Sequence, residues 1–359
     1  MQCVCFYCGD ISRSGGTERV TTVIASELAS RGYRVFILSH ANGESTGFPL
    51  HPQVALVSLG MQDYSANLSD FRAWFRLRRF IRQHAVDVLI DVDVILSWYS
   101  IPASWGTATR VLSWEHFHYF INIGDRFQRC RRYLGRRLAA RFAQALVVLT
   151  EKDRRQYREH LASRARLLAI PNPLTIVHQS RATPDSRLVL AAGRLVPQKG
   201  FDLLLQAWSQ VAADRPPGWR LRIVGSGQDE TMLKALCRRL ALEDSVEFVG
   251  NTDDMASQFL DAAIYVLSSR FEGFALVLLE ARSFGLPVVS FDCDCGPADI
   301  VRDGRDGLLV TPGDVTSLAR AMRRLIEDES CRRAMGQLAY EDRRFALQAV
   351  VDQWQELIG

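Results

Sequence analysis

The sequence has no long apolar run and very little lysine. No stretch reaches the roughly 18 consecutive apolar residues that a membrane-spanning helix needs. The first residues lack a charged segment followed by a long apolar one, so we expect no secretory signal peptide. Lysine supplies only three of the 44 basic residues, namely Lys152, Lys199 and Lys234. A GC-rich genome accounts for the preference for arginine, but the scarcity also gives each lysine more weight as a candidate functional residue.

Zinc-knuckle spacing is also missing. The chain has eight cysteines, but no pair of Cys-x-x-Cys knuckles, so we interpret them as core or strand residues rather than metal ligands. Without a secretory signal, reduced thiols in a cytosol are the default.

What is present is ordinary globular composition in a chain long enough for two domains. Its 359 residues are 48% apolar and 23% charged, which excludes a disordered chain, a collagen and a small disulfide scaffold. The charge is uneven: residues 1–172 carry 23 basic against 14 acidic residues, and residues 173–359 carry 21 against 26. The first half therefore suits an acidic partner or an anionic membrane surface.

Short apolar runs alternate with amphipathic stretches, which predicts parallel sheets covered by helices on both faces. In the first half we expect helices at 16–31, 68–84 and 126–143, and strands at 4–7, 33–38, 86–90, 110–112 and 145–149.

The same alternation restarts after two prolines, Pro171 and Pro173, which break any helix there. We expect a helix at 200–213, closing helices at about 314–328 and 331–357, and strands at 187–193, 221–225, 246–250, 264–267 and 287–291. The sequence therefore predicts two doubly wound Rossmann-like halves. Such sheets bind ligands beyond the carboxyl ends of their strands.

Two predicted helices are rich in arginine and aromatic residues. Residues 71–82 interleave phenylalanine and tryptophan with arginine, and residues 126–141 carry seven arginines. Such helices can lie on an anionic membrane, or they can simply present a solvated face. Nucleic-acid binding has no recognisable module in this chain, and we do not expect it.

Glycine-rich turns follow the first strand of each half. Gly15 and Gly16 open the first helix, whose free amides and dipole attract phosphate. In the second half, residues 193–200 bring Arg194, Lys199 and Gly200 to a strand's carboxyl end. One fork-shaped cation and one point cation suit a diphosphate. A simple turn remains the alternative for Gly15 and Gly16.

Two carboxylates, Glu272 and Glu280, stand eight residues apart around the start of a predicted helix. A fully helical segment would separate them by about 12 Å, too far for the acid and nucleophile of a glycosidase. They suit the two hydroxyl-bearing ends of one extended ligand better, with the amides of Phe274, Ala275 and Leu276 facing phosphates between them. His116 follows the 110–112 strand, where it could bind a ligand or serve a structural role.

Together these motifs resemble glycosyltransferase family 4, the retaining nucleotide-sugar transferases of the GT-B fold. The resemblance covers nearly the whole chain and rests on Gly15-Gly16, on Gly-Arg-Leu…Lys-Gly at 193–200, and on Glu-x7-Glu at 272–280. Further segments, such as Trp-Glu-His-Phe at 114–117, resemble members that build bacterial polysaccharide or lipid-linked oligosaccharide. One departure is Asp299, which stands where the family's Gly-x-x-Glu has its glutamate.

The resemblance implies an acceptor-side domain at 1–172 and a nucleotide-sugar domain at 173–340, facing each other across a cleft. A helix within 341–359 would return to the N-terminal domain. It implies that Arg194 and Lys199 hold the donor diphosphate, with amides from Gly15-Gly16 and 274–276. Glu280 would bind the ribose, Glu272 and His116 the transferred sugar, and Asn251 the base.

The implied reaction is substitution with retention, in which Arg194, Lys199 and helix amides stabilise the departing nucleoside diphosphate. We expect a UDP-sugar donor, although GDP and ADP donors occur in the family, and a hexosyl or N-acetylhexosaminyl group as cargo. Two Asp-x-Asp sequences, at 91–93 and 292–294, could suggest a metal. Because cationic side chains already serve the diphosphate, we expect no metal and no other cofactor.

The expected acceptor is a growing glycan, on a lipid carrier, at the cytoplasmic face of a membrane that the basic helices contact peripherally. Three alternatives remain open: a nucleotide-sugar epimerase of the same fold, a sugar phosphorylase, and a catalytically silent subunit that binds a partner transferase.

Overall fold

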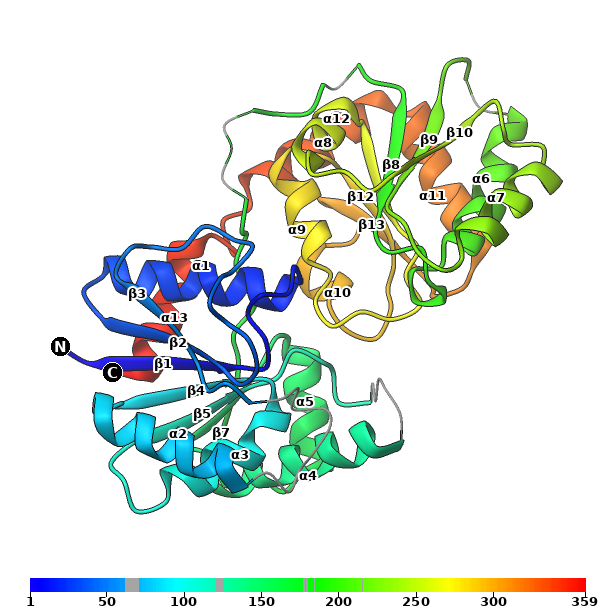
Figure 1. Ribbon diagram of the computed structural model, residues 1–359. Coiled ribbons are helices and arrows are strands. Elements are labelled where there is room, and N and C mark those ends of the chain that lie inside the picture. The colour runs from blue at the N-terminus through cyan, green and yellow to red at the C-terminus, as the bar shows by residue number, and fades with distance from the viewer. Residues whose placement is uncertain (62–70, 121–125, 177, 179, 184, 215) are drawn as a thin grey trace. The chain divides into compact units, whose positions relative to one another are not determined.

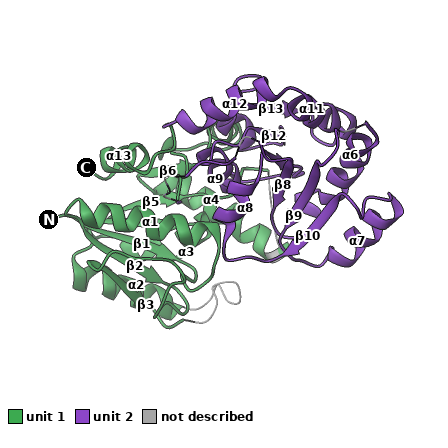
Figure 2. Cartoon of the chain, turned by 90° about the horizontal axis from the view of Figure 1, so that it is seen from above, with its two compact units in different colours: residues 1–175, 344–359 green, residues 176–343 purple. Residues whose placement is uncertain are grey.

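A computed structural model describes the chain except residues 62–70, 121–125, 177, 179, 184 and 215. It divides into two compact units (Figure 2), unit 1 with residues 1–175 and 344–359 and unit 2 with residues 176–343. The expected boundaries were 172/173 and 340/341. No helix among the described residues is both long enough and apolar enough to cross a membrane.

The strands of unit 1 form one parallel sheet in the order β3-β2-β1-β4-β5-β6-β7. Their bounds are β1 Cys3–Cys8, β2 Arg34–Ser39, β3 Val54–Ser58, β4 Val88–Val92, β5 Arg110–Trp114, β6 Ala145–Val148 and β7 Arg166–Ala169. The central strands are buried along their whole length, because helices cover both faces of a parallel sheet. Cys3, Cys5 and Cys8 are buried on β1, as expected for strand cysteines, and none of the eight cysteines, all of them described residues, forms a disulfide.

Helices cover both faces of this sheet (Figure 1). The helices α1 (Gly16–Ser30) and α13 (Leu347–Ile358) lie on one face, and α2 (Phe71–His84), α3 (Ser97–Ser104) and α4 (Arg126–Phe142) lie on the other. The short 3-10 turn η1 (Val94–Leu96) precedes α3, and α5 (Glu151–His160) packs beside β6 and β7. The predicted start of α2, residues 68–70, lies outside the described residues.

Unit 2 repeats the arrangement, with the strand order β10-β9-β8-β11-β12-β13. Its strands are β8 Leu188–Ala192, β9 Arg220–Val224, β10 Val246–Gly250, β11 Ile264–Leu267, β12 Val288–Phe291 and β13 Gly307–Val310. Its helical segments are η2 Pro197–Lys199, α6 Phe201–Asp214, α7 Glu230–Arg239, α8 Met255–Asp261, α9 Leu276–Ser283, α10 Pro297–Ile300, α11 Val315–Glu327 and α12 Glu329–Glu341. One apolar core joins α6, α7 and α11 to the sheet.

The fold class is confirmed: the chain contains two doubly wound parallel-sheet units. One prediction was wrong, because the single helix expected over 331–357 is two helices. α12 ends at Glu341 and α13 begins at Leu347, and α13 belongs to unit 1. The next residue after α12, Asp342, accepts from the buried Arg282 at 2.8 Å, which holds the chain in an extended conformation.

Candidate functional site

The strand order of each unit changes direction beside its first strand, which is where doubly wound folds form their ligand sites. In unit 2 this switch point lies between β8 and β11, and the loops after these two strands carry most of the predicted donor residues. In unit 1 it lies between β1 and β4, close to the Gly15-Gly16 turn.

Gly200 lets the loop after β8 approach the loop after β11. Its backbone is left-handed (φ 63°), and a Cβ there would come within 3.1 Å of the Ser268 carbonyl carbon. The Ser268 hydroxyl donates to the Lys199 carbonyl oxygen at 2.9 Å, and the Arg270 amide donates to the Gln198 carbonyl at 2.8 Å. The two loops therefore form one rigid surface at the carboxyl edge of the sheet.

Lys199 and Glu272 meet on this surface. The Lys199 Nζ lies 2.6 Å from Glu272 Oε1, and the Ser269 hydroxyl donates to the same oxygen at 2.6 Å. The side chain of Lys199 is 16% exposed and that of Glu272 is 7% exposed, so the ammonium is the more accessible partner. The stem of Lys199 packs against Gly193, where a Cβ would lie 3.3 Å from Cε. The structure thus brings together two predicted residues that are 73 positions apart.

The helix after Glu272 starts later than the sequence suggests. α9 begins at Leu276, and its N-cap residue, Ala275, is in the left-handed region (φ 48°). Because the chain from Glu272 to Ala275 is not helical, the 12 Å spacing of a continuous helix does not apply. Ala275 has no side-chain acceptor for the first-turn amides of α9, so this helix end lacks a side-chain cap.

Glu280 is buried on α9, near the Tyr265 hydroxyl. Burial raises the pKa of Tyr265, and the charges of Glu280 and Glu272 add to the rise. Both predicted carboxylates therefore lie within electrostatic range of one buried hydroxyl in the core of unit 2.

Two predicted residues of unit 2 are not drawn into this cluster. Arg194 is exposed, and its side chain forms no hydrogen bond or ion pair with a described residue, so the guanidinium is open to a ligand. Asn251 is exposed beyond β10, the edge strand, which β9 separates from β8.

In unit 1, the Gly15-Gly16 turn opens α1 as predicted, but an acidic side chain already covers it. The carboxylate of Glu18 folds back so closely that a Cβ on Gly15 would lie 3.3 Å from its Cδ. Burial raises the pKa of Glu18, although hydrogen bonds from the backbone at Gly15 and at Glu18 itself pull the other way. A phosphate at this helix end would have to displace or adjoin that carboxylate.

His116 lies beyond the carboxyl end of β5 and is 8% exposed. Its ring packs 4.3 Å from Trp114, and its Nε2 has no hydrogen-bond partner among the described residues. Burial lowers the pKa of His116 to about 4, so the imidazole is neutral at physiological pH.

Sequence reasoning missed the residues that surround His116. The neighbouring Glu115 forms ion pairs with Arg132 at 2.6 Å and with Arg136 at 3.0 Å, and Arg132 also pairs with Asp93 at 2.8 Å. Two features of the sequence could have indicated these buried ion pairs: the glycine at position 135 inside a predicted helix, and the position of Glu115 beside His116.

The Asp-x-Asp sequence at 91–93 has partners inside the protein. Asp93 pairs with Arg132, and the buried Asp91 accepts from the hydroxyls of Ser97 at 2.8 Å and Ser100 at 2.7 Å. Burial raises the pKa of Asp91 to about 7. These contacts give both carboxylates structural partners.

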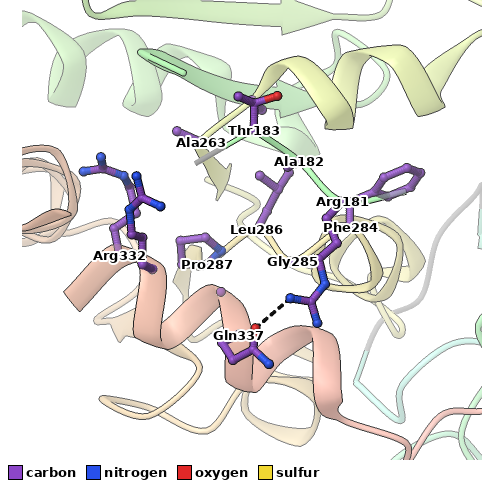
Figure 3. Close-up of a pocket in the computed structure, with 13 residues that line it drawn as sticks. Arg181, Ala182, Thr183, Ala263, Phe284, Gly285, Leu286, Pro287, Arg332 and Gln337 are labelled. Atoms are coloured by element: carbon purple, nitrogen blue, oxygen red, sulfur yellow. Dashed lines mark hydrogen bonds between the residues drawn. The ribbon is translucent and has the colours of Figure 1, made fainter. Parts of the chain in front are cut away.

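A separate hollow of about 200 Å³ lies at the amino ends of β11 and β12, at the opposite edge of the sheet from Lys199 (Figure 3). Its arginines have partners already. Arg181 donates to Gln337 at 2.7 Å, and Arg333 pairs with Asp185 at 2.6 Å. Arg332 donates to the Leu325 carbonyl at 2.7 Å. We do not assign this hollow to the candidate site.

Comparison with known proteins agrees with this geometry. Residues 15–173 match the family model described as a glycosyl transferase 4-like domain, and residues 175–342 match that of glycosyl transferases group 1.

Three relatives resemble the chain over nearly its full length. An uncharacterized glycosyltransferase of Haemophilus influenzae is 31% identical, with 100% of both chains covered. The amylovoran biosynthesis glycosyltransferase AmsD of Erwinia amylovora is 27% identical, with 97% of both covered. An α-1,4-N-acetyl-D-galactosaminyltransferase of Campylobacter jejuni, named for an undecaprenol-diphosphate-linked acceptor, is 27% identical, with 96% of this chain and 95% of the relative covered.

Solved structures share the fold. Sucrose-phosphate synthase from Thermosynechococcus elongatus superposes with a TM-score of 0.82 at 19% identity, covering 99% of this chain and 98% of that one. HepE from Anabaena, in complex with UDP, superposes with a TM-score of 0.79 at 20% identity, covering 100% and 99%. The two doubly wound units therefore form a GT-B fold, and the chain belongs to the family 4-like, group 1 glycosyltransferases.

Proposed function

We propose that this protein is a retaining, metal-independent glycosyltransferase that moves a sugar from a UDP-sugar to a growing glycan in surface polysaccharide or oligosaccharide assembly. The observation that carries the proposal is the Lys199–Glu272 pair at the switch point of unit 2, together with the exposed Arg194 on the same loop as Lys199 and the uncapped start of α9. Relatives named for amylovoran and for a lipid-linked glycan support the pathway class, and the UDP complex of HepE supports the nucleotide.

In this proposal the cations serve the leaving group. The bond between the anomeric carbon and the β-phosphate oxygen breaks, and its electron pair moves to that oxygen. Lys199, Arg194 and the first amides of α9 stabilise the resulting negative charge. The acceptor hydroxyl bonds to the anomeric carbon on the same face and gives its proton to the departing phosphate oxygen. Glu280 binds the ribose, Asn251 the base, and Glu272 and His116 the sugar.

The first experiment is calorimetric titration of the protein with UDP, GDP and ADP in EDTA. We expect one nucleotide, UDP, to bind tightly without a metal. Binding that appears only after manganese is added would contradict metal independence. The absence of binding by any nucleotide would favour the silent-subunit alternative.

Product analysis tests the reaction. We expect NMR of the product formed from a UDP-hexose or UDP-N-acetylhexosamine to show the anomeric configuration of the donor. Inversion at that carbon would overturn the retaining assignment. An epimerised donor in the absence of acceptor, or donor formation from free phosphate, would identify one of the alternative enzymes.

We also propose that unit 1 contacts an anionic membrane, where a lipid carrier would hold the acceptor at the cytoplasmic face. Neither α2 nor α4 contains an acidic residue. Phe75 is 73% exposed on α2, and Phe142 is 49% exposed on α4. A groove of about 470 Å³ beside α4 is lined by Arg137, Arg141 and Phe142, among others. Guanidinium groups beside apolar side chains suit lipid headgroups above acyl chains.

Only some arginines of α4 can contact a membrane, because Arg131, Arg132 and Arg136 are buried. Vesicle co-sedimentation tests the remainder. We expect binding to anionic vesicles at low salt, weaker binding at high salt, and a loss in the double variant Arg137→Gln/Arg141→Gln. The matched control changes two exposed arginines of α5, Arg155→Gln/Arg158→Gln. Equal binding by both double variants would contradict a specific membrane face.

A further inference from the structure

A buried carboxylate, Glu115, lies at the centre of a hydrogen-bond network in unit 1. Its Oε1 accepts from Arg132 Nη1 at 2.6 Å and from the Phe117 amide at 3.1 Å. Its Oε2 accepts from Arg136 Nε at 3.0 Å and from the Tyr157 hydroxyl at 2.9 Å. Burial alone would raise the pKa of Glu115, but the charges of the two arginines hold it below its usual value. The carboxylate is therefore ionised and satisfied at both oxygens.

The second carboxylate of the network, Asp93, is held in a strained backbone. Its φ of 133° is rare for a residue other than glycine, so the surrounding contacts must hold it in place. Arg132 donates to both of its oxygens, at 3.0 and 2.8 Å, and the Ile95 amide donates to Oδ1 at 3.0 Å. Two arginines thus face two carboxylates, and the buried network is close to electroneutral.

The same arginines fasten the loop that follows β5. Arg136 donates to the carbonyl oxygens of Tyr119 at 2.6 Å and His118 at 3.1 Å. The guanidinium of Arg132 lies 4.3 Å from the centre of the Phe117 ring. Residues 117, 118 and 119 are therefore each in contact with an arginine of α4.

Gly135 brings these arginines within reach. A Cβ at this position would lie 3.0 Å from the Val94 carbonyl carbon, so α4 packs directly on the backbone of η1. Arg132 and Arg136 stand on either side of this glycine, one turn of helix apart.

Several buried polar atoms of this region remain unsatisfied among the described residues, among them Trp114 Nε1 and His116 Nε2. His116 lies between the anchored Glu115 and Phe117, and its buried Nε2 has no hydrogen-bond partner there. An unpaired buried polar atom costs free energy unless a ligand completes it.

We propose that Arg132 and Arg136 are positioning residues, which fix the 115–119 loop so that the imidazole of His116 presents Nε2 to a ligand hydroxyl. That the hydroxyl belongs to a sugar rests on the proposed function. The positioning role rests on the network itself. It also gives these two arginines a task that differs from the membrane contact proposed for the exposed arginines of α4.

Lysine substitutions test the role, because they keep the charge and remove the fork that bonds several acceptors at once. In Arg132→Lys and Arg136→Lys we expect kcat for sugar transfer to fall about 10- to 100-fold. The dissociation constant for UDP should change less than about twofold, because the predicted diphosphate-binding cations, Arg194 and Lys199, lie in unit 2. Arg155→Lys, an exposed residue of α5, is the matched control and should leave kcat, KM and UDP binding unchanged.

A lower melting temperature with unchanged kcat and KM in both variants would overturn the proposal, since it would mark a purely structural network. If a lysine variant does not fold, Tyr157→Phe gives a milder test, because it removes one hydroxyl from Glu115. We expect Tyr157→Phe to lower kcat by a smaller factor at unchanged UDP affinity.

A second readout does not depend on activity. NMR of ¹³C-labelled histidine, with the His116 signal assigned from its loss in His116→Gln, follows the titration of the ring directly. In the wild type we expect His116 to resist protonation down to about pH 4. In Arg136→Lys the released loop should expose the ring and move its titration toward the ordinary value near 6.5.

An unchanged titration in both lysine variants would contradict the positioning role. A shifted titration in a protein that binds no nucleotide would support positioning and contradict the proposed function. The two proposals can therefore fail separately.

Discussion

The two units share a strand order, yet they treat their cations in opposite ways. In unit 2, Arg194 is exposed, and Lys199 has a single carboxylate partner and remains 16% exposed. In unit 1, the side chains of Arg132 and Arg136 are 7% and 6% exposed, and carboxylates and carbonyls surround them. Unit 2 thus exposes positive charge beyond the carboxyl ends of its strands, whereas unit 1 buries it.

This difference makes each unit suited to a different ligand chemistry. An accessible ammonium and guanidinium beside an uncapped helix end suit an anion such as a diphosphate. A neutral imidazole in an electroneutral setting suits an uncharged hydroxyl. Whether an arginine binds ligand or shapes a loop therefore depends on the carboxylates that the fold brings to it.

Among the tests of the diphosphate site that we propose in unit 2, removal of the Lys199 ammonium should have the largest effect. In Lys199→Ala we expect kcat to fall by about 100-fold or more and UDP affinity to fall with it. The truncation also leaves the buried Glu272 without its counter-charge. Steady-state kinetics and calorimetry measure both effects.

The matched control is Lys234→Ala, which removes an exposed lysine that pairs with Glu230 on α7 at 2.6 Å. It should behave as the wild type. Unchanged turnover in Lys199→Ala would contradict the distinction between ligand-binding cations in unit 2 and buried, structural cations in unit 1.

Glycine substitutions should perturb each candidate site by disturbing a close backbone contact beside it. Gly135→Ala would force α4 away from η1, and Gly200→Ala would separate the loops after β8 and β11. We expect each to lower the free energy of unfolding by about 1–3 kcal/mol, measured by chemical denaturation. Gly135→Ala should also shift the His116 titration, whereas Gly200→Ala should weaken UDP binding.

Gly47→Ala serves as the control, because Gly47 is exposed and a Cβ there meets only the Ser14 hydroxyl at an ordinary 3.5 Å. If Gly200→Ala moved the His116 titration and Gly135→Ala did not, the proposal that unit 2 holds the diphosphate site and unit 1 the positioned imidazole would be wrong.

The neutral imidazole of unit 1 should make stability depend on pH. The pKa of His116 is about 4 in the folded protein, against 6.5 for an ordinary histidine. The unfolded chain binds the proton more readily between these values, so the contribution of His116 to stability falls as pH falls through this window. At pH 5 the loss is about 2 kcal/mol.

Other groups titrate in the same pH window. The contribution of His116 is therefore measured as the difference in unfolding free energy between two proteins. The free energy of unfolding of the wild type minus that of His116→Gln should fall between pH 7.5 and pH 5. A constant difference would show that the ring is solvated.

The smallest expected effect concerns Glu18, which places a negative charge over the start of α1. If this helix end binds donor phosphate, Glu18→Gln should strengthen UDP binding about threefold, since the competing charge is removed. Glu27→Gln, in the last turn of the same helix, is the control. Weaker binding in Glu18→Gln would mean that the carboxylate supports the ligand instead of competing with it.

The sequence predicted the alternation of strands and helices because continuous apolar runs and amphipathic runs have different periods. It also singled out Lys199 and Glu272, which lie in the segments after β8 and β11, two neighbouring strands of the sheet. It missed β3, β7 and β13, which are short and partly exposed or lie at sheet edges. The break after α12 carries no proline or glycine. There Asp342 pairs with Arg282 at 2.8 Å, a tertiary contact that no local pattern predicts.

The buried role of Arg132 and Arg136 could not be predicted from local pattern. Arginine is seldom buried unless it is paired, so an arginine-rich helix indicates a solvated or membrane-facing surface. The partners, Asp93 and Glu115, directly follow β4 and β5 and lie up to 39 positions away in the sequence. Only the packing of α4 on η1 brings the four charges together.

The position of α13 has a consequence for how this protein is made. α13 completes unit 1 with buried residues such as Val350, Val351 and Trp354, but all of unit 2 separates it from the rest of that unit. During synthesis, the sheet of unit 1 must therefore wait for unit 2 to leave the ribosome before this part of its core arrives. Trp354 then packs 5.0 Å from Trp114, the residue before Glu115 and His116. A fragment cut at the first boundary between the units would lack support directly behind its own candidate site.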